Sequence, residues 1–410
     1  MAVNEKQDYA IFTVCNLAYL PKAMVLAESV LKFNNVKLKI YLVDRKVDFD
    51  FSAVDADIYW IEDIGIPNLY ELAFKYDIIE LSTGLKPCLT LKLLDRFRKV
   101  IFLDPDTCLY HSVAPVLSEL EVHSIVLTPH YTTPLSNPSP PGWGDDIGMM
   151  RFGSFNLGFY AVNNSPEGIR FLKWWSDRCL NLNFMETQFG LSTDQKWVSI
   201  APCFFRDLYV SFNLGYNVAP WNVFERRIEK DPDGGYVVNG VYPLVFFHFS
   251  NFDEKDPEYL KKRSLLKKDV DCPALLEIGT VYKQALSAKN TQTPSIKYGF
   301  DYMSGGEYIS PTLRRAYVCV SGEFPPNYNP FDSDGVVGNF ARKNFLFERK
   351  TPAYKPASFR DLSENKRKLR YIYFMMRLIL RLVGPNKFYN FSRLLVYLSS
   401  YRQNRGLWKY

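Results

Sequence analysis

The chain has 410 residues, of which 47% are hydrophobic and 23% charged, so it can bury a sizeable core and is neither disordered nor fibrous. Its formal net charge of +6 is unevenly spread. Residues 360–410 carry 12 basic and 2 acidic side chains, whereas the first 359 residues carry 38 and 42. This distribution excludes a basic surface along the whole chain, so we expect no nucleic-acid partner, and it sets the C-terminal end apart as a basic tail.

Sequence features that report on cellular location favour the cytoplasm. Residues 1–9 are polar and run directly into a strand-like segment, so they lack the charged start and apolar stretch of a signal peptide. Nowhere does the chain offer about 18 nearly uncharged apolar residues, the minimum for a membrane-spanning helix. The seven cysteines form no CxxC pair, which is typical of reduced, buried thiols. We therefore expect a cytoplasmic protein without a spanning helix.

The first 130 residues alternate short apolar runs with helical patterns. The expected strands are 9–15, 38–43, 57–60 and 100–103, and the expected helices are 21–33 and 85–97. Pro21 suits the first turn of the first helix. Strands separated by helices imply right-handed crossovers, so the sequence predicts an α/β fold with a mostly parallel sheet and helices on both faces.

The rest of the chain divides into segments of different character. Residues 128–154 hold five prolines and four glycines, which indicates a long loop of the kind that binds or covers ligands. The segments expected next are a strand at 155–162, a helix at 166–179, a hairpin at 236–249 around Asn239-Gly240, a charged helical stretch at 253–288 and an irregular stretch at 296–344. We divide the chain into an α/β domain (1–252), a helical and irregular extension (253–356) and the basic tail (357–410).

Two carboxylates at the end of a buried strand are the strongest local sign of chemistry. In Lys99-Val-Ile-Phe-Leu-Asp-Pro-Asp-Thr107 the strand ends at Asp104 and Asp106. Residues two apart in an extended segment share a face, so both can hold one divalent cation at the carboxyl edge of a parallel sheet, where α/β folds bind ligands. Surface turns carry such pairs by chance, but the apolar strand before this pair favours a site.

The same residues partly match another motif. Asp-Pro-Asp-Thr resembles the nucleophile loop of haloacid-dehalogenase-like phosphatases. That loop normally ends the first strand of its fold, whereas three expected strands precede Asp104, and no Gly-Asp-Gly-x-x-x-Asp motif follows it. His248, within Val245-Phe-Phe-His-Phe-Ser250, is a further candidate ligand, although a lone histidine in an apolar strand is more often a core residue.

A series of motifs over about residues 9–253 resembles the GT-A nucleotide-sugar glycosyltransferases, most closely glycosyltransferase family 8, the glycogenin and lipooligosaccharide galactosyltransferase group. The motifs, in the order of the family, are Phe12-Thr-Val-Cys-Asn16, Tyr41-Leu-Val-Asp44, Phe102-Leu-Asp-Pro-Asp-Thr107, Phe155-Asn-Leu-Gly158, Ser192-Thr-Asp-Gln195, Tyr216-Asn-Val218 and Phe247-His-Phe249. The sequence departs after the histidine, where Ser250-Asn-Phe-Asp-Glu-Lys-Asp256 replaces the family's Gly and Lys-Pro-Trp, with Lys255 as a possible substitute for the phosphate lysine.

This resemblance implies roles for individual residues. Asp104, Asp106 and His248 would bind Mn²⁺ or Mg²⁺, which would neutralise the departing nucleoside diphosphate. The other implied donor-binding residues are Thr13, Asn16 and Asp44 at the nucleoside and Lys86 at the phosphates. Asn156, Asp194 and Gln195 would surround the reacting sugar. Locally, Asn156 can instead support a turn and Asp194 can cap a helix.

The implied activity is metal-dependent transfer of a hexose from a nucleotide sugar, UDP-hexose above all, to an acceptor hydroxyl with retention of configuration. Bacterial-type surface polysaccharide or glycolipid synthesis would use it, with a glycan or a lipid-linked molecule as acceptor. An inverting enzyme needs a carboxylate base, for which Asp145, Asp146 and Asp194 are candidates. The alternative is a non-catalytic, membrane-associated carbohydrate-binding or scaffold protein on the same fold. The three retained metal-binding residue types argue against it.

The sequence of the tail predicts two amphipathic helices. One stripe of the first helix is basic, with Lys366, Arg370, Arg377 and Arg381, and the opposite side is apolar, with Ile372, Met375, Ile379 and Leu382. Gly384-Pro385 ends this helix and residues 388–401 form the second. The pair can pack on the catalytic domain, but each basic residue near an anionic membrane adds about 1 kcal/mol of binding. We expect peripheral association with the cytoplasmic face of the membrane.

Overall fold

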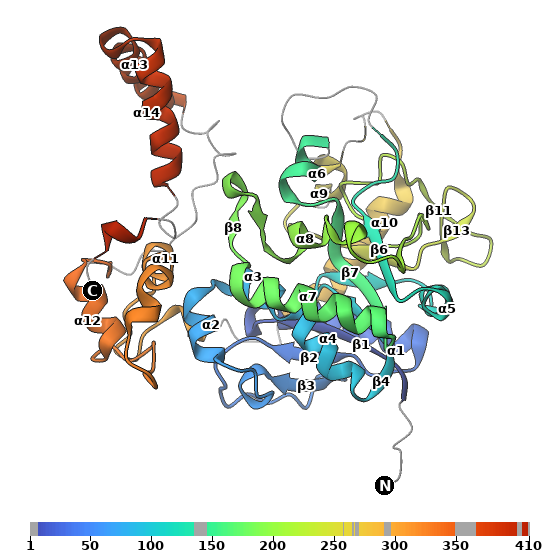
Figure 1. Ribbon diagram of the computed structural model, residues 1–410. Helices are drawn as coiled ribbons and strands as arrows, with labels where there is room; N and C mark the ends of the chain where they lie inside the picture. The colour runs from blue at the N-terminus through green and yellow to red at the C-terminus, as the bar shows by residue number, and fades with distance from the viewer. Residues whose placement is uncertain are drawn as a thin grey trace. The chain divides into compact units, whose positions relative to one another are not determined.

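The computed structural model describes residues 7–134, 146–256, 258–264, 266, 270–290, 297–348, 366–399 and 404–408. The chain folds into two compact units, Met1–Phe300 and Asp301–Tyr410 (Figure 1). The three-part division expected from the sequence stays a prediction.

A seven-stranded sheet in the order β10-β6-β7-β4-β1-β2-β3 forms the centre of the first unit. Its strands are β1 (Gln7–Cys15), β2 (Lys39–Leu42), β3 (Asp57–Trp60), β4 (Phe97–Leu103), β6 (Ile125–Pro129), β7 (Phe155–Asn163) and β10 (Leu208–Val210). Strand β7 is antiparallel to β4 and β6, and the other neighbours are parallel. The predicted α/β class with a mostly parallel sheet is confirmed.

Helices cover both faces of this sheet. Helix α1 (Leu20–Asn34) packs against one face, in a cluster that includes Ile11 and Ala161. Neighbouring residues of a strand point to opposite faces. Tyr160 accordingly lies on the other face, where its hydroxyl is 2.7 Å from Thr90 Oγ1 of α4 (Lys86–Leu94) and its ring is 5.0 Å from that of Trp175 in α7 (Pro166–Leu182).

Local signals set the ends of these helices. Helix α7 begins where Ser165 Oγ accepts a hydrogen bond from Gly168 N and Pro166 occupies the first turn. Helix α1 ends at Asn34 and is capped by Asn35, which takes a left-handed φ of 53°. Other elements of this unit include α2 (Leu69–Lys75), α3 (Ile78–Gly84), β5 (Thr107–Leu109), α5 (Ala114–Val122), β8 (Met185–Glu186), β9 (Leu191–Ser192), α8 (Thr193–Val198), β11 (Ile228–Lys230), α9 (Tyr259–Arg263) and α10 (Pro273–Asn290).

Four element predictions need correction, of which the hairpin at 236–249 is described separately below. The helix expected over 85–97 ends at Leu94, because Phe97 already pairs with Gln7 as the first residue of β4. The loop expected over 128–154 contains α6 (Asp146–Phe152), while residues 135–145 lie outside the described part. The stretch expected to be irregular, 296–344, contains α11 (Pro311–Val320) and α12 (Val336–Lys343), and Ser310 caps α11. Most of its Gly, Pro and Asn residues lie outside these two helices.

The hairpin expected at 236–249 forms only in part. Strand β12 (Tyr236–Val238) pairs with a short β13 (Tyr242–Pro243) around Asn239 and Gly240, both of which have positive φ angles of 53° and 69°. The second half of the expected strand leaves this hairpin. It becomes β14 (Phe246–His248), which pairs antiparallel with β5. This pairing brings residue 248 to the end of the central sheet.

The second unit is helical. Its core contains Leu313, Tyr317 and Phe340 from α11 and α12, and the guanidinium of the buried Arg314 lies 2.7 Å from Asp301 Oδ1. Two further helices, α13 (Lys366–Val383) and α14 (Pro385–Leu398), are separated by Gly384 with a φ of 81°, as the tail pattern predicts. None of the described helices combines the length and the hydropathy that crossing a bilayer requires.

Candidate functional site

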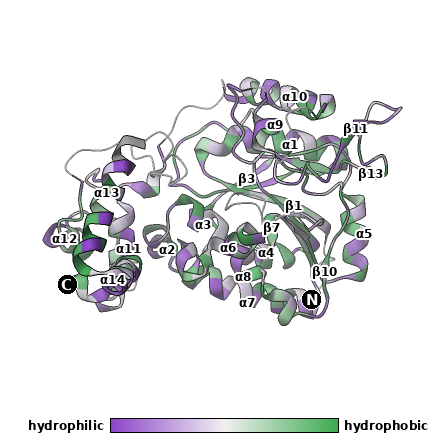
Figure 2. Cartoon of the chain, turned by 90° about the horizontal axis from the view of Figure 1, so that it is seen from above, coloured by the Kyte–Doolittle hydropathy of each residue, from purple (hydrophilic) through white to green (hydrophobic). Residues whose placement is uncertain are grey.

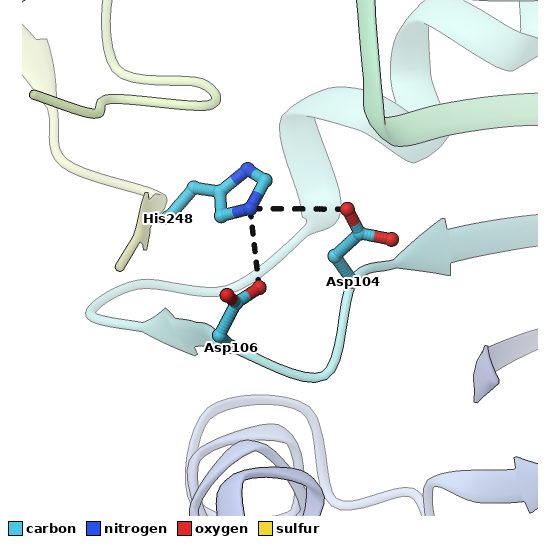
Figure 3. A group of neighbouring side chains, drawn as sticks. All are labelled: Asp104, Asp106 and His248. Atoms are coloured by element: carbon cyan, nitrogen blue, oxygen red, sulfur yellow. Dashed lines mark ion pairs between the residues drawn. The ribbon is translucent and has the colours of Figure 1, made fainter. Parts of the chain in front are cut away.

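Asp104, Asp106 and His248 meet at the carboxyl edge of the central sheet. Strand β4 ends at Leu103, and the Asp104-Pro-Asp106 turn leads into β5, opposite which β14 places His248 in register with Thr107. The Nε2 atom of His248 lies 3.1 Å from Asp106 Oδ1 and 3.8 Å from Asp104 Oδ2 (Figure 3). One ligand atom from each residue lies within 4.8 Å of the other two.

The chemistry of this group suits a divalent cation. Two carboxylates and an imidazole are a donor set that Mn²⁺ and, with more oxygen ligands, Mg²⁺ accept. Burial alone would lower the pKa of His248, but the charges of Asp106 and Asp104 raise it above its ordinary 6.5. Burial would raise the pKa of Asp106, but His248 and Lys22 lower it to about 2. The same carboxylates that favour a proton on the imidazole would favour a bound cation, which would take the place of that proton.

Asn217 holds the imidazole from behind. Its Oδ1 lies 3.3 Å from His248 Nδ1, so a proton on Nδ1 is donated to Asn217 and Nε2 faces the carboxylates. Asn217 is itself fixed, because its Nδ2 donates to Thr128 Oγ1 and Asn156 Oδ1, each at 3.1 Å. Asn156 Oδ1 also accepts from Gly158 N at 3.0 Å. Because Asn156 and Gly158 both lie within β7, this contact braces a strand, and the alternative that Asn156 supports a turn is not borne out.

Lys86 and Asp194 form a buried ion pair next to the metal-ligand candidates. The Lys86 amine lies 3.2 Å from Asp104 Oδ1, 3.2 Å from Asp194 Oδ2 and 2.9 Å from Leu157 O. Burial would lower the pKa of Lys86, but the two carboxylates raise it further than burial lowers it. Burial, with Asp104, raises the pKa of Asp194 despite the opposing effect of Lys86.

The helix-cap alternative for Asp194 is wrong. Ser192 is the N-cap residue of α8, and the Asp194 side chain lies in the first turn, facing Lys86. Lys86, which the family resemblance places at the donor phosphates, is fully occupied by protein oxygens in this structure.

A cavity of about 280 Å³ lies beside this group. Its walls are formed by His130, Tyr131, Gly148, Met149, Phe152, Asn156, Met185, Ser192, Thr193, Gln195, Pro220, Trp221, Ser250 and Asn251. The Gln195 amide is oriented by a 2.9 Å bond from its Nε2 to Phe152 O. The structure therefore brings two of the predicted sugar-binding residues, Asn156 and Gln195, into one cavity wall, with Asp194 buried next to Gln195 in α8.

Trp221, an aromatic side chain of this cavity, contacts the metal-ligand candidate His248, and His130 in turn contacts Trp221. The Trp221 ring meets the His248 ring edge to face, at 5.2 Å between centroids and 83° between planes. The Trp221 indole Nε1 is buried and makes no hydrogen bond to the described residues. Burial lowers the pKa of His130 to about 4, so this neighbouring imidazole is neutral at physiological pH. The sequence pattern gave no sign of either residue.

The residues expected at the nucleoside lie at the carboxyl ends of β1 and β2 and do not line the cavity. Thr13 is buried within β1, and Asn16 Oδ1 accepts from Tyr19 N at 3.2 Å. Asp44 accepts backbone hydrogen bonds from Leu17, Arg45 and Gly299, at 3.4, 3.0 and 2.7 Å. The structure places these side chains on the same sheet edge as Asp104, and their contact with a nucleoside stays a prediction.

Of the remaining residues singled out from the sequence, Asp146 and Lys255 make no hydrogen bond or ion pair with the metal-ligand candidates among the described residues. Asp146 begins α6, where its Oδ1 accepts from Tyr131 Oη at 3.2 Å, and Asp145 lies outside the described residues. Lys255 is exposed. A cation that sequence reasoning missed is Lys22, whose amine lies 3.9 Å from Asp106 Oδ2. No sequence signal links residues 84 positions apart, and only the packing of α1 beside β5 brings them together.

The sequence matches no family model. Among curated proteins it is similar to two uncharacterized proteins of Bacillus subtilis (strain 168). YfnD is 27% identical over 192 residues, which are 45% of this chain and 58% of YfnD, and YfnF is 25% identical over 154 residues, which are 38% of this chain and 50% of YfnF. The chain thus spans between half and three fifths of the length of these relatives.

Solved structures similar to this chain include glycosyltransferases. The glycosyltransferase GlyE of Streptococcus pneumoniae TIGR4 is 16% identical, with 71% of this chain and 66% of that chain covered and a TM-score of 0.36. The galactosyltransferase LgtC, in complex with donor and acceptor sugar analogs, is 18% identical, with 68% and 96% covered and a TM-score of 0.39. Core-mannan synthase A of Aspergillus fumigatus, in its Mn/GDP form, is 11% identical, with 50% and 72% covered and a TM-score of 0.31.

Proposed function

We propose that the protein is a metal-dependent hexosyltransferase that moves a sugar from a nucleotide donor, UDP-hexose above all, to an acceptor hydroxyl. One observation carries this proposal. Asp104, Asp106 and His248 converge at the carboxyl edge of a mostly parallel sheet, next to a cavity of sugar-binding size whose wall includes Asn156 and Gln195.

The residues of the site have different roles in such a transfer. Mn²⁺ or Mg²⁺ held by the two aspartates and the histidine would neutralise charge on the nucleoside diphosphate as it leaves. Gln195, with its amide oriented by Phe152 O, and Asn156 bind the sugar in the cavity. Thr13, Asn16 and Asp44 contact the nucleoside.

The state of Asp194 removes one of the three candidate bases of an inverting reaction, and we propose transfer with retention on the family resemblance. An inverting transferase needs a carboxylate that is free to accept the acceptor's proton. Asp194 is buried and engaged by the Lys86 amine at 3.2 Å, which leaves it poorly placed for that role. In a retaining reaction the departing diphosphate itself can receive the proton, while preorganised polar groups such as Gln195 stabilise the positive sugar.

The tail supports a place for this activity at the cytoplasmic face of the membrane, in surface polysaccharide or glycolipid synthesis. Along α13 hydrophobic and hydrophilic residues lie side by side (Figure 2). Apolar side chains of α13 and α14, from Leu380 at 36% to Leu382 at 76%, are exposed. Exposed apolar side chains among basic ones fit an anionic lipid surface, where a lipid-linked acceptor would be found.

A screen of nucleotide sugars for metal-dependent release of nucleoside diphosphate tests the function. We expect release with one donor in the presence of Mn²⁺ or Mg²⁺, and none from the Asp106→Asn variant or with EDTA. Full turnover by Asp106→Asn in EDTA would refute the metal site. A scaffold protein would release nothing with any donor, and a phosphatase would instead hydrolyse p-nitrophenyl phosphate.

A further inference from the structure

Lys22 reaches the candidate metal group from a different element than its other members. It lies in the first turn of α1, and this helix runs beside β5, where Leu109 N donates to Ser29 Oγ at 3.1 Å. The Lys22 amine lies 3.9 Å from Asp106 Oδ2, while Oδ1 of the same carboxylate faces His248. Lys22 thus stands on the opposite side of Asp106 from the imidazole.

The Lys22 amine is available for a ligand. A separation of 3.9 Å is an ion pair but is too long for a hydrogen bond. Among the described residues the amine has no hydrogen-bond acceptor, and it lies 4.2 Å from the centroid of the exposed Tyr19 ring. Its side chain is 17% exposed. Lys86, by contrast, is 5% exposed and is held by two carboxylates and a carbonyl.

Once a nucleotide-sugar donor binds, the site needs a positively charged side chain in addition to the metal ion. Asp104 and Asp106 balance one divalent cation, so the negative charge that a diphosphate adds needs a further partner. Among the described positions after the metal-ligand histidine, Ser250 and Asn251 line the cavity but carry no charge, and Lys255 makes no ion pair with Asp104 or Asp106. An ammonium 3.9 Å from Asp106 is within reach of phosphate oxygens that share the cation with this carboxylate.

We infer that Lys22 binds the diphosphate of the donor and stabilises it as a leaving group, an inference that rests on the proposed function. In the transfer, the bond from the anomeric carbon to the diphosphate oxygen breaks and its electron pair goes to that oxygen. The acceptor oxygen bonds to the anomeric carbon, and the acceptor's proton goes to the diphosphate. Lys22 donates hydrogen bonds to the oxygens on which the negative charge collects.

Calorimetry on the full-length protein tests the inference, with Mn²⁺ alone as one titrant and with inorganic pyrophosphate and UDP, each in saturating Mg²⁺, as the others. We expect Lys22→Gln to weaken pyrophosphate and UDP binding about tenfold or more, because it removes a hydrogen bond to a charged group. Lys22→Arg keeps the charge and most of the affinity. Lys32→Gln is the control, since it makes the same change at an exposed position of the same helix.

The Mn²⁺ titration separates a direct contact from an effect through Asp106. If Lys22 contacts the diphosphate, Lys22→Gln binds Mn²⁺ as tightly as wild type or more tightly, because a competing cation has gone. Unchanged pyrophosphate affinity in Lys22→Gln, or a loss of Mn²⁺ affinity that accounts for the whole change, overturns the inference. Failure of the wild-type protein to bind pyrophosphate or UDP overturns the proposed function as well.

Discussion

The imidazole of His248 occupies space that only a glycine at position 158 leaves open. A Cβ on Gly158 would lie 2.4 Å from His248 Cε1 and 2.5 Å from Nδ1, distances that atoms in proteins do not tolerate. The ring cannot retreat easily, because it is buried and Trp221 packs edge-on against it. The glycine in the Phe-Asn-x-Gly segment therefore shapes the metal site sterically.

Gly158→Ala should displace the imidazole and abolish metal binding. Because the added methyl group meets a buried ring rather than a flexible chain end, the clash can be removed only by forcing His248, against its packing, out of its place beside Asp106. Titration with Mn²⁺, followed by electron paramagnetic resonance, measures the loss. Gly322→Ala is the matched control, since a Cβ there meets nothing within 4 Å. Equal Mn²⁺ affinity in both variants would show that the ring has room to adjust.

Asn217→Gly should weaken metal binding about 10- to 100-fold, because the partner that orients His248 through Nδ1 is removed. Glycine accepts the positive φ of 49° at this position, so backbone strain does not confound the result. Asn35→Gly makes the same change at another left-handed position, the exposed end of α1. If Mn²⁺ affinity falls no further in Asn217→Gly than in Asn35→Gly, Asn217 does not position the imidazole.

Metal affinity should fall as the pH drops through the raised pKa of His248. Neighbouring carboxylates keep the proton on His248 at pH values above its ordinary 6.5, and a metal ion binds only the neutral imidazole. Binding at pH 6.5 should therefore release protons and be weaker than at pH 8.5. His248→Gln should bind Mn²⁺ more weakly but lose this pH dependence, and a wild-type affinity that is flat over the same range would contradict the assignment.

The three metal-ligand candidates could be predicted from the sequence because each lies in a recognisable local pattern. A buried strand followed by Asp-x-Asp identifies Asp104 and Asp106, and the family order adds His248. Their proximity, however, depends on β14 pairing with β5 across about 140 residues, which no local pattern encodes. Lys22, His130 and Trp221 were missed for the same reason: each is an ordinary residue that tertiary packing brings to the site.

Helix boundaries show a similar limit of local signals. Helix α6 was missed because glycines at 148 and 153 and the prolines before them suggest a loop, although its residues form a wall of the cavity. Strand β14 was merged with β13 because both lie in one apolar run. They are separate strands because they pair with different partners: β14 pairs with β5, and β13 pairs with β12.

Lys86→Met should lower the free energy of unfolding by about 3 kcal/mol or more, because it leaves the buried carboxylate of Asp194 without its cation. Urea denaturation of the full chain without added metal measures the effect. Lys92→Met removes a charge from an exposed position of the same helix and should change stability little. If the two variants unfold at the same urea concentration, Asp194 gains little from Lys86, and the ion pair is not a structural support of the site.

The tail should bind anionic membranes, and its removal after about residue 357 should abolish that binding. Sedimentation with vesicles of phosphatidylglycerol and phosphatidylcholine, compared with phosphatidylcholine alone, measures it. Binding should require the anionic lipid and weaken as salt rises, because several basic residues each add about 1 kcal/mol near such a surface at low screening.

Two sets of substitutions separate the electrostatic from the hydrophobic contribution to membrane binding by the tail. Replacing Arg370, Arg377 and Arg381 with Gln removes three of the twelve basic side chains of the tail while leaving its apolar side chains, so binding should fall and become less dependent on salt. Replacing the exposed Leu382 and Phe391 with Ser leaves the charge, so binding should fall while its salt dependence stays. Equal sedimentation of full-length and truncated protein would place any membrane contact elsewhere in the chain. Binding that responds to neither set of substitutions would mean that α13 and α14 face protein rather than lipid.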